Sequence, residues 1–232
     1  MLLAVPLFLL VDSEYGDLIF YGYGQQLALI LTSVGFVYAY GKSTQRVKCV
    51  MLAGLVLGML GEVLLSLGLG MYHYRLENVP LWVMFAHGIA FAAVYKLSHN
   101  PLIWRNRERI QKQLIVFAIL YAFFLLIFNN DWYGFLCSVV FMIILFTAKK
   151  SRLFFLIMFV LVCYIELVGT ATGCWYWPEI AFGLFSWLPS GNPPSGIAVF
   201  YFLFDAAVFY IYIYILYPRT KQRYQRMMLR RA

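Results

Sequence analysis

The chain has 232 residues, of which 63% are apolar and 19% aromatic, while only 12% carry a formal charge. A soluble domain has about twice that share of charged residues, so this composition excludes a soluble globular protein. The mean hydropathy of +0.78 and several apolar runs predict an all-α integral membrane protein. The formal net charge of +8 would suit a nucleic-acid binder. It is explained better by loop charges that set membrane topology, so no nucleic-acid partner is expected.

The N-terminal segment and the cysteines carry no strong functional signal. Residues 1–11 are apolar but too short to span a bilayer, and they lack the basic residues and cleavage site of a signal peptide. We expect residues 1–16 to lie along the outer surface of the membrane. The four cysteines have unrelated spacings without a C-x-x-C motif, so we interpret them as core residues.

Seven apolar segments have about the length of a membrane-spanning helix. They cover residues 17–40, 48–70, 79–97, 113–129, 132–148, 153–174 and 196–217. The sequence therefore predicts seven transmembrane helices in a single polytopic domain over residues 1–232.

The basic residues orient this bundle. In the seven-helix arrangement, 17 of the 18 lysines and arginines fall in three loops and the C-terminal tail on one side, and only Arg75 falls on the other. Because cytoplasmic loops carry the excess of basic residues, we expect the N-terminus outside and the C-terminus in the cytoplasm. Six or eight spans would break this separation. The pattern indicates a multi-pass protein of a cell membrane, such as a bacterial inner membrane.

Two segments 104 residues apart resemble each other. Glu62 precedes the segment Gly70–Tyr74, and Glu166 precedes Gly173–Trp177 with the spacing slipped by one residue. This similarity predicts an internal repeat on a 3+1+3 plan. Its parts are a first three-helix half at 17–97, a linker helix at 113–129, a second half at 132–217 and a basic tail at 218–232.

Polar side chains lie at one depth in five of the predicted helices. Glu62 and Glu166 each follow a basic residue at the inner end of the helix by 14 positions, which is about 21 Å of helix in a core about 30 Å thick. The other members lie eight or nine residues from the outer ends of their helices: His87, Asp205, Gln25 and Gln26. We interpret this layer as one central site, because charged groups inside membrane helices are costly and mark functional sites. The alternative is a set of separate contacts that pair helices.

The helix faces fit such a site. Glu166, Thr170 and Gly173 share one face of their helix, and Tyr201 shares a face with Asp205. Aromatic residues gather just above the layer, and we expect most of them to form the interfacial belt. The candidate substrate-binding residues are Gln25, Gln26, Thr170, Tyr201, Trp175, Trp177 and Tyr72.

The carboxyl groups point to acid-base chemistry. A carboxyl in a low-dielectric site favours its neutral form, and such an acid can protonate an alkene or a leaving oxygen. Nearby aromatic faces would stabilise a developing cation. We predict Glu166 as the leading acid, Glu62 or Asp205 as the partner base, and His87 as a relay or orienting group.

Other membrane chemistries lack the residues that they need. The last predicted helix has no lysine for a retinal Schiff base, and three histidines are too few for a di-iron or bis-histidine haem centre. Carboxylate and imidazole groups are metal ligands by type, but their spacing here matches no ligand motif. We therefore predict no metal and no cofactor.

The two similar segments also carry a resemblance to a known group of enzymes. Each has an intramembrane glutamate, then Gly-x-Tyr-x-Tyr or Gly-x-Trp-x-Trp, then a helix led by Pro80 or, in the second segment, Pro189. In these features the chain resembles the membrane carotenoid-modifying enzymes, namely the heptahelical lycopene cyclases and the related carotenoid 1,2-hydratases. The Pro-x-Glu-Glu signature of the cyclases is absent. The resemblance implies acid-initiated, cofactor-free chemistry on an isoprenoid double bond, with Glu62 and Glu166 as the acids.

Three functions fit these observations. The first is a membrane enzyme of the lyase or isomerase type that acts on a lipid-soluble substrate, either isoprenoid or acyl-lipid, beneath a cap formed by loop 174–195. The second is a small proton-coupled transporter or channel. Such carriers usually have repeated prolines in their core helices, and the interiors of the predicted helices have none. The third is an assembly subunit whose polar layer only locks helices together. The expected partners are membrane lipids and the substrate, and the Tyr- and Ile-rich run 209–217 offers a surface for oligomerisation.

Overall fold

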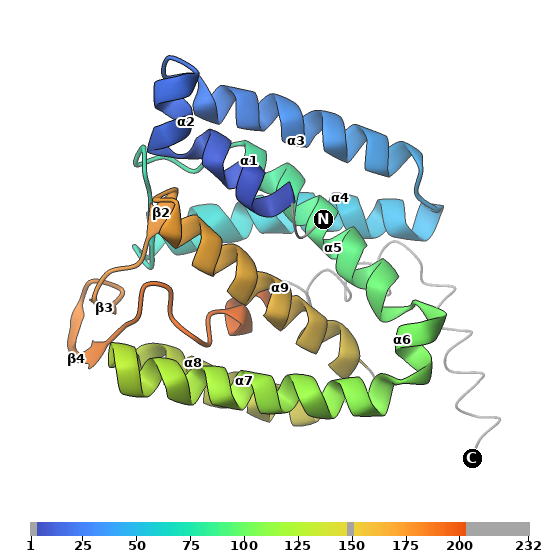
Figure 1. Ribbon diagram of the computed structural model, residues 1–232, viewed down its shortest axis with the longest axis vertical. Coiled ribbons are helices and arrows are strands. Elements are labelled where there is room, and N and C mark those ends of the chain that lie inside the picture. Colours follow the sequence, from blue (N-terminus) through green and yellow to red (C-terminus); the bar gives the residue numbers. More distant parts are fainter. Residues whose placement is uncertain (1–3, 148–150, 203–232) are drawn as a thin grey trace.

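The computed structural model describes residues 4–147 and 151–202, and these residues are mostly helical (Figure 1). Within these residues, three helical segments are long and apolar enough to cross a membrane: Gln45–Gly68, Arg107–Asn129 and Arg152–Ala171. Trp82–Ser98 and Trp132–Thr147 are shorter apolar helices. This set of helices fits a multi-pass membrane protein.

The elements of the described ranges are helical except for four short strands. The helices are α1 (Ala4–Asp12), α2 (Glu14–Ile19), α3 (Gly24–Gly41), α4 (Gln45–Glu62) with its π-helical continuation η1 (Val63–Gly68), α5 (Trp82–Ser98), α6 (Pro101–Arg105), α7 (Arg107–Asn129), α8 (Trp132–Thr147) and α9 (Arg152–Ala171). The strands are β1 (His73–Tyr74), β2 (Trp175–Tyr176), β3 (Ile180–Ala181) and β4 (Phe185–Pro189).

Five of the seven predicted spans appear as helices, namely α4 with η1, α5, α7, α8 and α9. The predicted span 17–40 is wrong at its start, because Tyr21 and Gly22 adopt positive φ and break the chain between α2 and α3. The Asp17 side chain then accepts a hydrogen bond from the backbone N–H of Gly24, the first residue of α3 (3.0 Å).

The last predicted span is helical at 198–202, where the described part of the chain ends. The rest of that span, including Asp205, and the basic tail lie outside the described residues. The number of seven spans, the orientation of the termini and the outer position of residues 1–16 therefore stay predictions.

Helix α9 is the centre of the bundle. It runs diagonally between the α7–α8 pair and the layer that contains α4 and α5, and it also contacts α1 (Figure 1). Of its most apolar 18-residue window, 61% is buried, against 17% for α7. A helix that is apolar on all sides and largely buried suits a central position, whereas α7 presents an apolar face outward.

Helices α4 and α5 pack closely because glycines of α4 leave room for ring side chains of α5. A Cβ atom at Gly54 would lie 2.9 Å from the Phe91 ring, and one at Gly58 would lie 2.5 Å from the His87 ring. Both distances are shorter than carbon atoms tolerate. The glycines of α4 therefore permit the close approach of α5.

The strands form two small antiparallel sheets at one end of the bundle (Figure 1). In the first sheet β1 pairs with β2, with His73 opposite Tyr176 and Tyr74 opposite Trp175. The strands therefore join the ends of the α4–η1 helix and of α9, which lie about one hundred residues apart in the sequence. The sequence did not predict these sheets, because two-residue strands leave no periodic pattern.

The chain leaves both helices in the same way. Each helix is followed by a glycine with left-handed φ, Gly70 (60°) after η1 and Gly173 (70°) after α9, as is common at helix C-termini. The following backbone N–H groups bond back into the helix, from Met71 to Leu65 and from Cys174 to Gly169. The first bond reaches back one residue further than the second, because η1 is π-helical and holds an additional residue.

Candidate acid-base site

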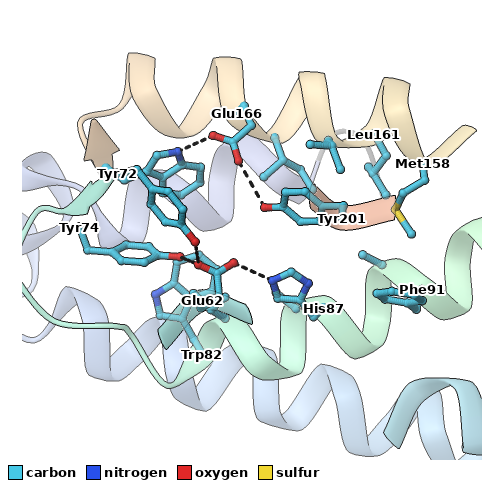
Figure 2. Close-up of a pocket in the computed structure, with 16 residues that line it drawn as sticks. Glu62, Tyr72, Tyr74, Trp82, His87, Phe91, Met158, Leu161, Glu166 and Tyr201 are labelled. Atoms are coloured by element: carbon cyan, nitrogen blue, oxygen red, sulfur yellow. Dashed lines mark hydrogen bonds and ion pairs between the residues drawn. The ribbon is translucent and has the colours of Figure 1, made fainter. Parts of the chain in front are cut away.

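Glu62 and Glu166 face each other across one buried cavity of about 70 Å³ (Figure 2). Glu62 is the last residue of α4 and Glu166 lies near the end of α9. Glu62 is only 5% exposed and Glu166 only 4%. The other residues that line the cavity are mostly apolar or aromatic: Tyr72, Tyr74, Trp82, Val83, Ala86, His87, Ala90, Phe91, Met158, Leu161, Val162, Ile165, Trp175 and Tyr201.

Three donors hold the carboxyl group of Glu62. The hydroxyl groups of Tyr72 and Tyr74 both donate to Oε2, the latter at 2.7 Å, and Nε2 of His87 lies 2.8 Å from Oε1. Burial, followed by the nearby Glu62 charge, holds the pKa of Tyr72 and Tyr74 well above the usual range of a phenol. Both tyrosines therefore keep their protons and remain donors to Glu62.

Three donors also hold Glu166, but they are of a different kind. The indole N–H groups of Trp175 (2.8 Å) and Trp177 (3.1 Å) both donate to Oε2. The hydroxyl group of Tyr201 donates to Oε1 over a longer distance of 3.3 Å. Because an indole N–H can only donate, Oε2 acts as an acceptor in both bonds, which favours Oε1 as the atom that carries a proton on this carboxyl group.

The two donor sets occupy corresponding positions in the chain. Glu62 is held by residues ten and twelve positions later, and Glu166 by residues nine and eleven positions later. The π-helical turn of η1 holds the one additional residue, so the aromatic donors reach their carboxyl groups in both segments. This correspondence is what the predicted internal repeat requires, and the duplication itself stays a prediction.

Ring contacts connect the two carboxyl groups. His87 stacks on Tyr201 with centroids 5.6 Å apart, and Tyr72 lies 4.7 Å from the ring of Trp177. Each contact pairs a Glu62 donor with a Glu166 donor. The two donor sets are therefore one continuous cluster, in which a shift of one ring is felt by both carboxyl groups.

The structure brings most of the predicted site residues together. Besides the two glutamates, His87, Tyr72, Trp175 and Tyr201 line the cavity, and Trp177 lines a smaller adjoining one of about 20 Å³. Asp205 lies outside the described residues.

Three predicted substrate-binding residues lie elsewhere. Thr170 bonds to the backbone carbonyl oxygen of Glu166 in its own helix (2.8 Å). Gln25 and Gln26 lie in the first turn of α3, where Gln25 exchanges hydrogen bonds with Asn78 at 3.3 and 3.0 Å and Gln26 is exposed. None of the three lines the cavity.

The aromatic residues that the sequence assigned mainly to an interfacial belt are buried around the carboxyl groups instead. Tyr72, Tyr74, Trp175 and Trp177 are each at most 6% exposed. The prediction named three of them as site residues but omitted Tyr74, although its place after Glu62 corresponds, with a slip of one residue, to that of Trp177 after Glu166. Trp82 was also missed, because an aromatic residue at the start of an apolar helix is ordinarily read as an interface anchor.

A buried aspartate anchors the loop that follows β4. Asp131 is fully buried and accepts three backbone N–H bonds, from Gly134 (3.0 Å), Gly191 (2.8 Å) and Ser195 (2.7 Å). In the same loop the Asn192 side chain accepts the backbone N–H of the Trp177 residue (3.0 Å). Asp131 thus fixes the loop that positions one of the Glu166 donors. Sequence reasoning missed it, since an aspartate before a helix signals only a local N-cap.

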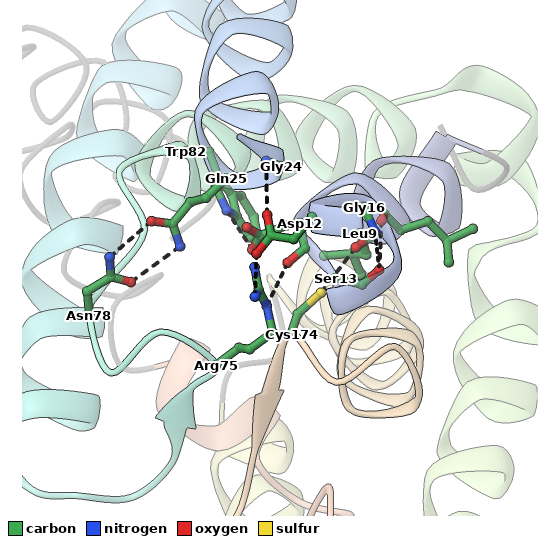
Figure 3. Close-up of polar contacts among 12 residues, drawn as sticks. Leu9, Asp12, Ser13, Gly16, Gly24, Gln25, Arg75, Asn78, Trp82 and Cys174 are labelled. Atoms are coloured by element: carbon green, nitrogen blue, oxygen red, sulfur yellow. Dashed lines mark hydrogen bonds and ion pairs between the residues drawn. The ribbon is translucent and has the colours of Figure 1, made fainter. Parts of the chain in front are cut away.

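The N-terminal segment is hydrogen-bonded to Trp82, which lines the cavity (Figure 3). Asp12 accepts a bond from the Trp82 indole (3.0 Å), and the Arg75 guanidinium bonds the backbone oxygen of Asp12 (3.1 Å) and the Asp17 carboxylate (2.6 Å). Burial raises the pKa of Asp12 from 3.8 to about 6, although Trp82 and Arg75 oppose the shift. Trp82 thereby connects α1 to the acid-base site.

Metal ligands and known relatives give no further assignment. In the described parts of the chain, no cluster of three or more His, Cys, Asp and Glu side chains could hold a metal ion, and none of the four cysteines forms a disulfide bond. No model of a known protein family, no curated protein and no solved structure matches this chain.

Proposed function

We propose that the protein is an integral membrane enzyme that performs acid-base chemistry on a lipid-soluble substrate. One observation carries this proposal: two buried carboxyl groups from different helices face a single apolar cavity, and neither forms a salt bridge with a lysine or arginine within the described residues. A buried carboxyl without a cationic partner is costly and is retained where it has a task.

Glu166 is the proposed acid. Its Oε2 atom accepts from two indole groups, so the transferable proton sits on Oε1, whose one bond within the described residues is the longer contact with Tyr201. A substrate double bond or leaving oxygen that replaces this weak contact would receive the proton. The surrounding rings would stabilise the positive charge that develops on the substrate.

Glu62 and His87 form the proposed base. Glu62 accepts two phenol hydroxyl groups, which favour its charged form, and its other oxygen is 2.8 Å from the imidazole. The imidazole and the carboxyl group lie within hydrogen-bond distance of each other, so this pair can take a proton from a substrate carbon or from water. With Glu166 as donor, the outcome is an isomerisation, a hydration or its reverse.

The substrate class follows from the walls of the cavity. Apart from the groups that bond to the two glutamates, and from Trp82, the lining is hydrocarbon and aromatic, which suits an isoprenoid or acyl chain. The resemblance to lycopene cyclases and carotenoid 1,2-hydratases supports an isoprenoid double bond. The same proposal includes seven spans in a 3+1+3 repeat, with the N-terminus outside the cytoplasm, and chemistry that needs no cofactor.

The test is the substitution Glu166→Gln. The glutamine oxygen can accept from Trp175 and Trp177 while its amide donates to Tyr201, so the fold is retained but the transferable proton is lost. Chromatography of lipid extracts from producing cells should show loss of one product and accumulation of its precursor. The matched control is Glu108→Gln on α7, whose side chain is 84% exposed and which should leave the extract unchanged. An unchanged product with Glu166→Gln would refute the acid assignment.

A structural role is the second candidate, because all four carboxylate oxygens already have hydrogen-bond partners within the protein. An assembly subunit of this kind predicts that Glu166→Gln lowers the yield of folded protein and leaves lipid extracts unaltered. A proton-coupled transporter stays a prediction of the sequence. It requires substrate-dependent proton flux in liposomes that contain the purified protein.

A further inference from the structure

A second cavity of about 230 Å³ lies beside the acid-base site, between α1, α3, α5 and α9. We call it the lateral groove. It is lined by Val5, Phe8, Leu9, Leu31, Thr32, Gly35, Trp82, Ala86, Ile89, Ala90, Leu161 and Ile165. Leu31 at its rim is 49% exposed, so the groove opens on the outer surface of the bundle.

The lateral groove and the acid-base cavity share one wall. Trp82, Ala86 and Ala90 line both spaces and follow one another at four-residue intervals along one face of α5. Leu161 and Ile165 of α9, also four residues apart, line both spaces from the opposite side. The two alanines are small, so little side-chain bulk separates the groove from the cavity beside the carboxyl groups.

The groove offers no hydrogen bond to an occupant. Only two of its lining side chains carry a polar atom, and both are already bonded within the protein. The Thr32 hydroxyl donates to the backbone oxygen of Ala28 (2.7 Å), and the Trp82 indole donates to Asp12 (3.0 Å; Figure 3). Because a water molecule in a cavity needs two to four polar partners, the groove favours hydrocarbon over water.

We propose that the lateral groove binds the hydrocarbon chain of the substrate whose reacting group lies between Glu62 and Glu166. This inference rests on the proposed function, since it assigns the remainder of the same molecule. A cavity of about 150 Å³ holds benzene, so at the same ratio the groove holds on the order of nine carbon atoms. The groove therefore selects for an apolar chain on one side of the reacting group.

Gly35 provides a substitution that fills the groove without disturbing the acids. A Cβ atom there meets only Cδ1 of Ile89, at 3.8 Å, which is an ordinary contact. The ring in Gly35→Phe would occupy the groove itself. Gly41→Phe is the matched control, because Gly41 ends the same helix, has nothing within 4 Å of an added Cβ atom and does not line the groove.

The experiment uses alkanols that carry a photoreactive diazirine and an alkyne, in a series of chain lengths, with the full-length protein in phosphatidylcholine vesicles. We expect saturable labelling of groove residues on α3 and α5 in the wild type and in Gly41→Phe, and loss of the saturable part in Gly35→Phe. The lipid that accumulates in Glu166→Gln cells should compete with the probe, whereas added phosphatidylcholine should not.

The proposal would be overturned if labelling of the groove rose linearly with probe concentration. Linear labelling is expected for the outward face of α7 and would indicate ordinary contact with membrane lipid. Competition by phosphatidylcholine would overturn it as well, by assigning the groove to a bulk membrane lipid. The proposed function fails separately, through an unchanged product in Glu166→Gln. That result together with saturable labelling would leave a lipid-binding groove beside a structural polar cluster.

Discussion

The contact between Gly169 and Trp175 gives the sharpest test of the site geometry. A Cβ atom built at Gly169 would lie 2.0 Å from Cζ2 and 2.1 Å from Cη2 of the Trp175 indole. Gly169 is one turn after Glu166 on α9. The Trp175 indole therefore packs against the helix at a position from which its N–H reaches the Glu166 carboxyl group. The substitution Gly169→Ala must therefore displace the indole.

The size of the effect follows from these distances. Carbon atoms prefer separations of at least about 3.5 Å, so the ring must move by roughly 1.5 Å. Its bond to Oε2 of Glu166, now 2.8 Å, would then be broken. Leaving the buried indole N–H without its partner costs about 1–3 kcal/mol, and overpacking costs about 1–3 kcal/mol. We expect the free energy of unfolding to fall by about 3–5 kcal/mol.

The assay is thermal unfolding in detergent, combined with the chromatography of lipid extracts. Gly41→Ala is the control, and the helical propensity of alanine predicts a gain of up to about 1 kcal/mol there. The double variant with Trp175→Phe, which lacks the outer part of the indole, should tolerate the new methyl group. Strict additivity of Gly169→Ala and Trp175→Phe in this double-mutant cycle would refute the reasoning, because it would mean that the two residues do not collide.

Three further predictions concern the neighbouring contacts. Gly58→Ala should push the His87 ring away from its partner and lower product formation about tenfold or more, measured in lipid extracts beside Gly41→Ala. Asp131→Asn would place an amide N–H against the backbone N–H of Ser195; we expect a loss of about 2 kcal/mol and faster proteolysis of the loop, and unchanged cleavage would contradict this. Asp12 has a pKa raised from 3.8 to about 6, so the folded state binds its proton more tightly than the unfolded chain. The stability from this group should be complete below about pH 4 and lost as the pH rises through 6, by up to about 3 kcal/mol; Asp12→Asn should flatten that part of the profile of melting temperature against pH.

The helices and the pairing of the two acids could be predicted because both follow from the chain locally. Apolar runs mark helices, and equal distances from the basic ends placed Glu62 and Glu166 at one depth. The break before Gly24 was missed because Tyr21 and Gly22 do not interrupt the apolar pattern, although their backbone turns there. Periodicity reports which segment is apolar, and it is insensitive to a single turn of positive φ.

The partners of the acids were harder to predict, since they come from loops. Tyr72 and Trp175 reach their glutamates only because the chain reverses after each helix, and hydropathy treats such residues as interface anchors. The bonds from Asp131 to Gly191 and Ser195 join positions at least 60 residues apart, and nothing in the local sequence marks that contact. Two-residue strands and hydrogen bonds between such distant residues can be recognised only in a three-dimensional structure.

The π-helical turn at Val63–Gly68 has a consequence for how such proteins diverge in length. An insertion inside a membrane helix ordinarily rotates everything beyond it, and the side chains after it would turn away from their targets. Here the widened turn takes up the surplus residue, and the aromatic pair that follows still points at its acid. Two segments of unequal length can therefore carry equivalent geometry, and an alignment that forbids gaps within helices would miss this correspondence.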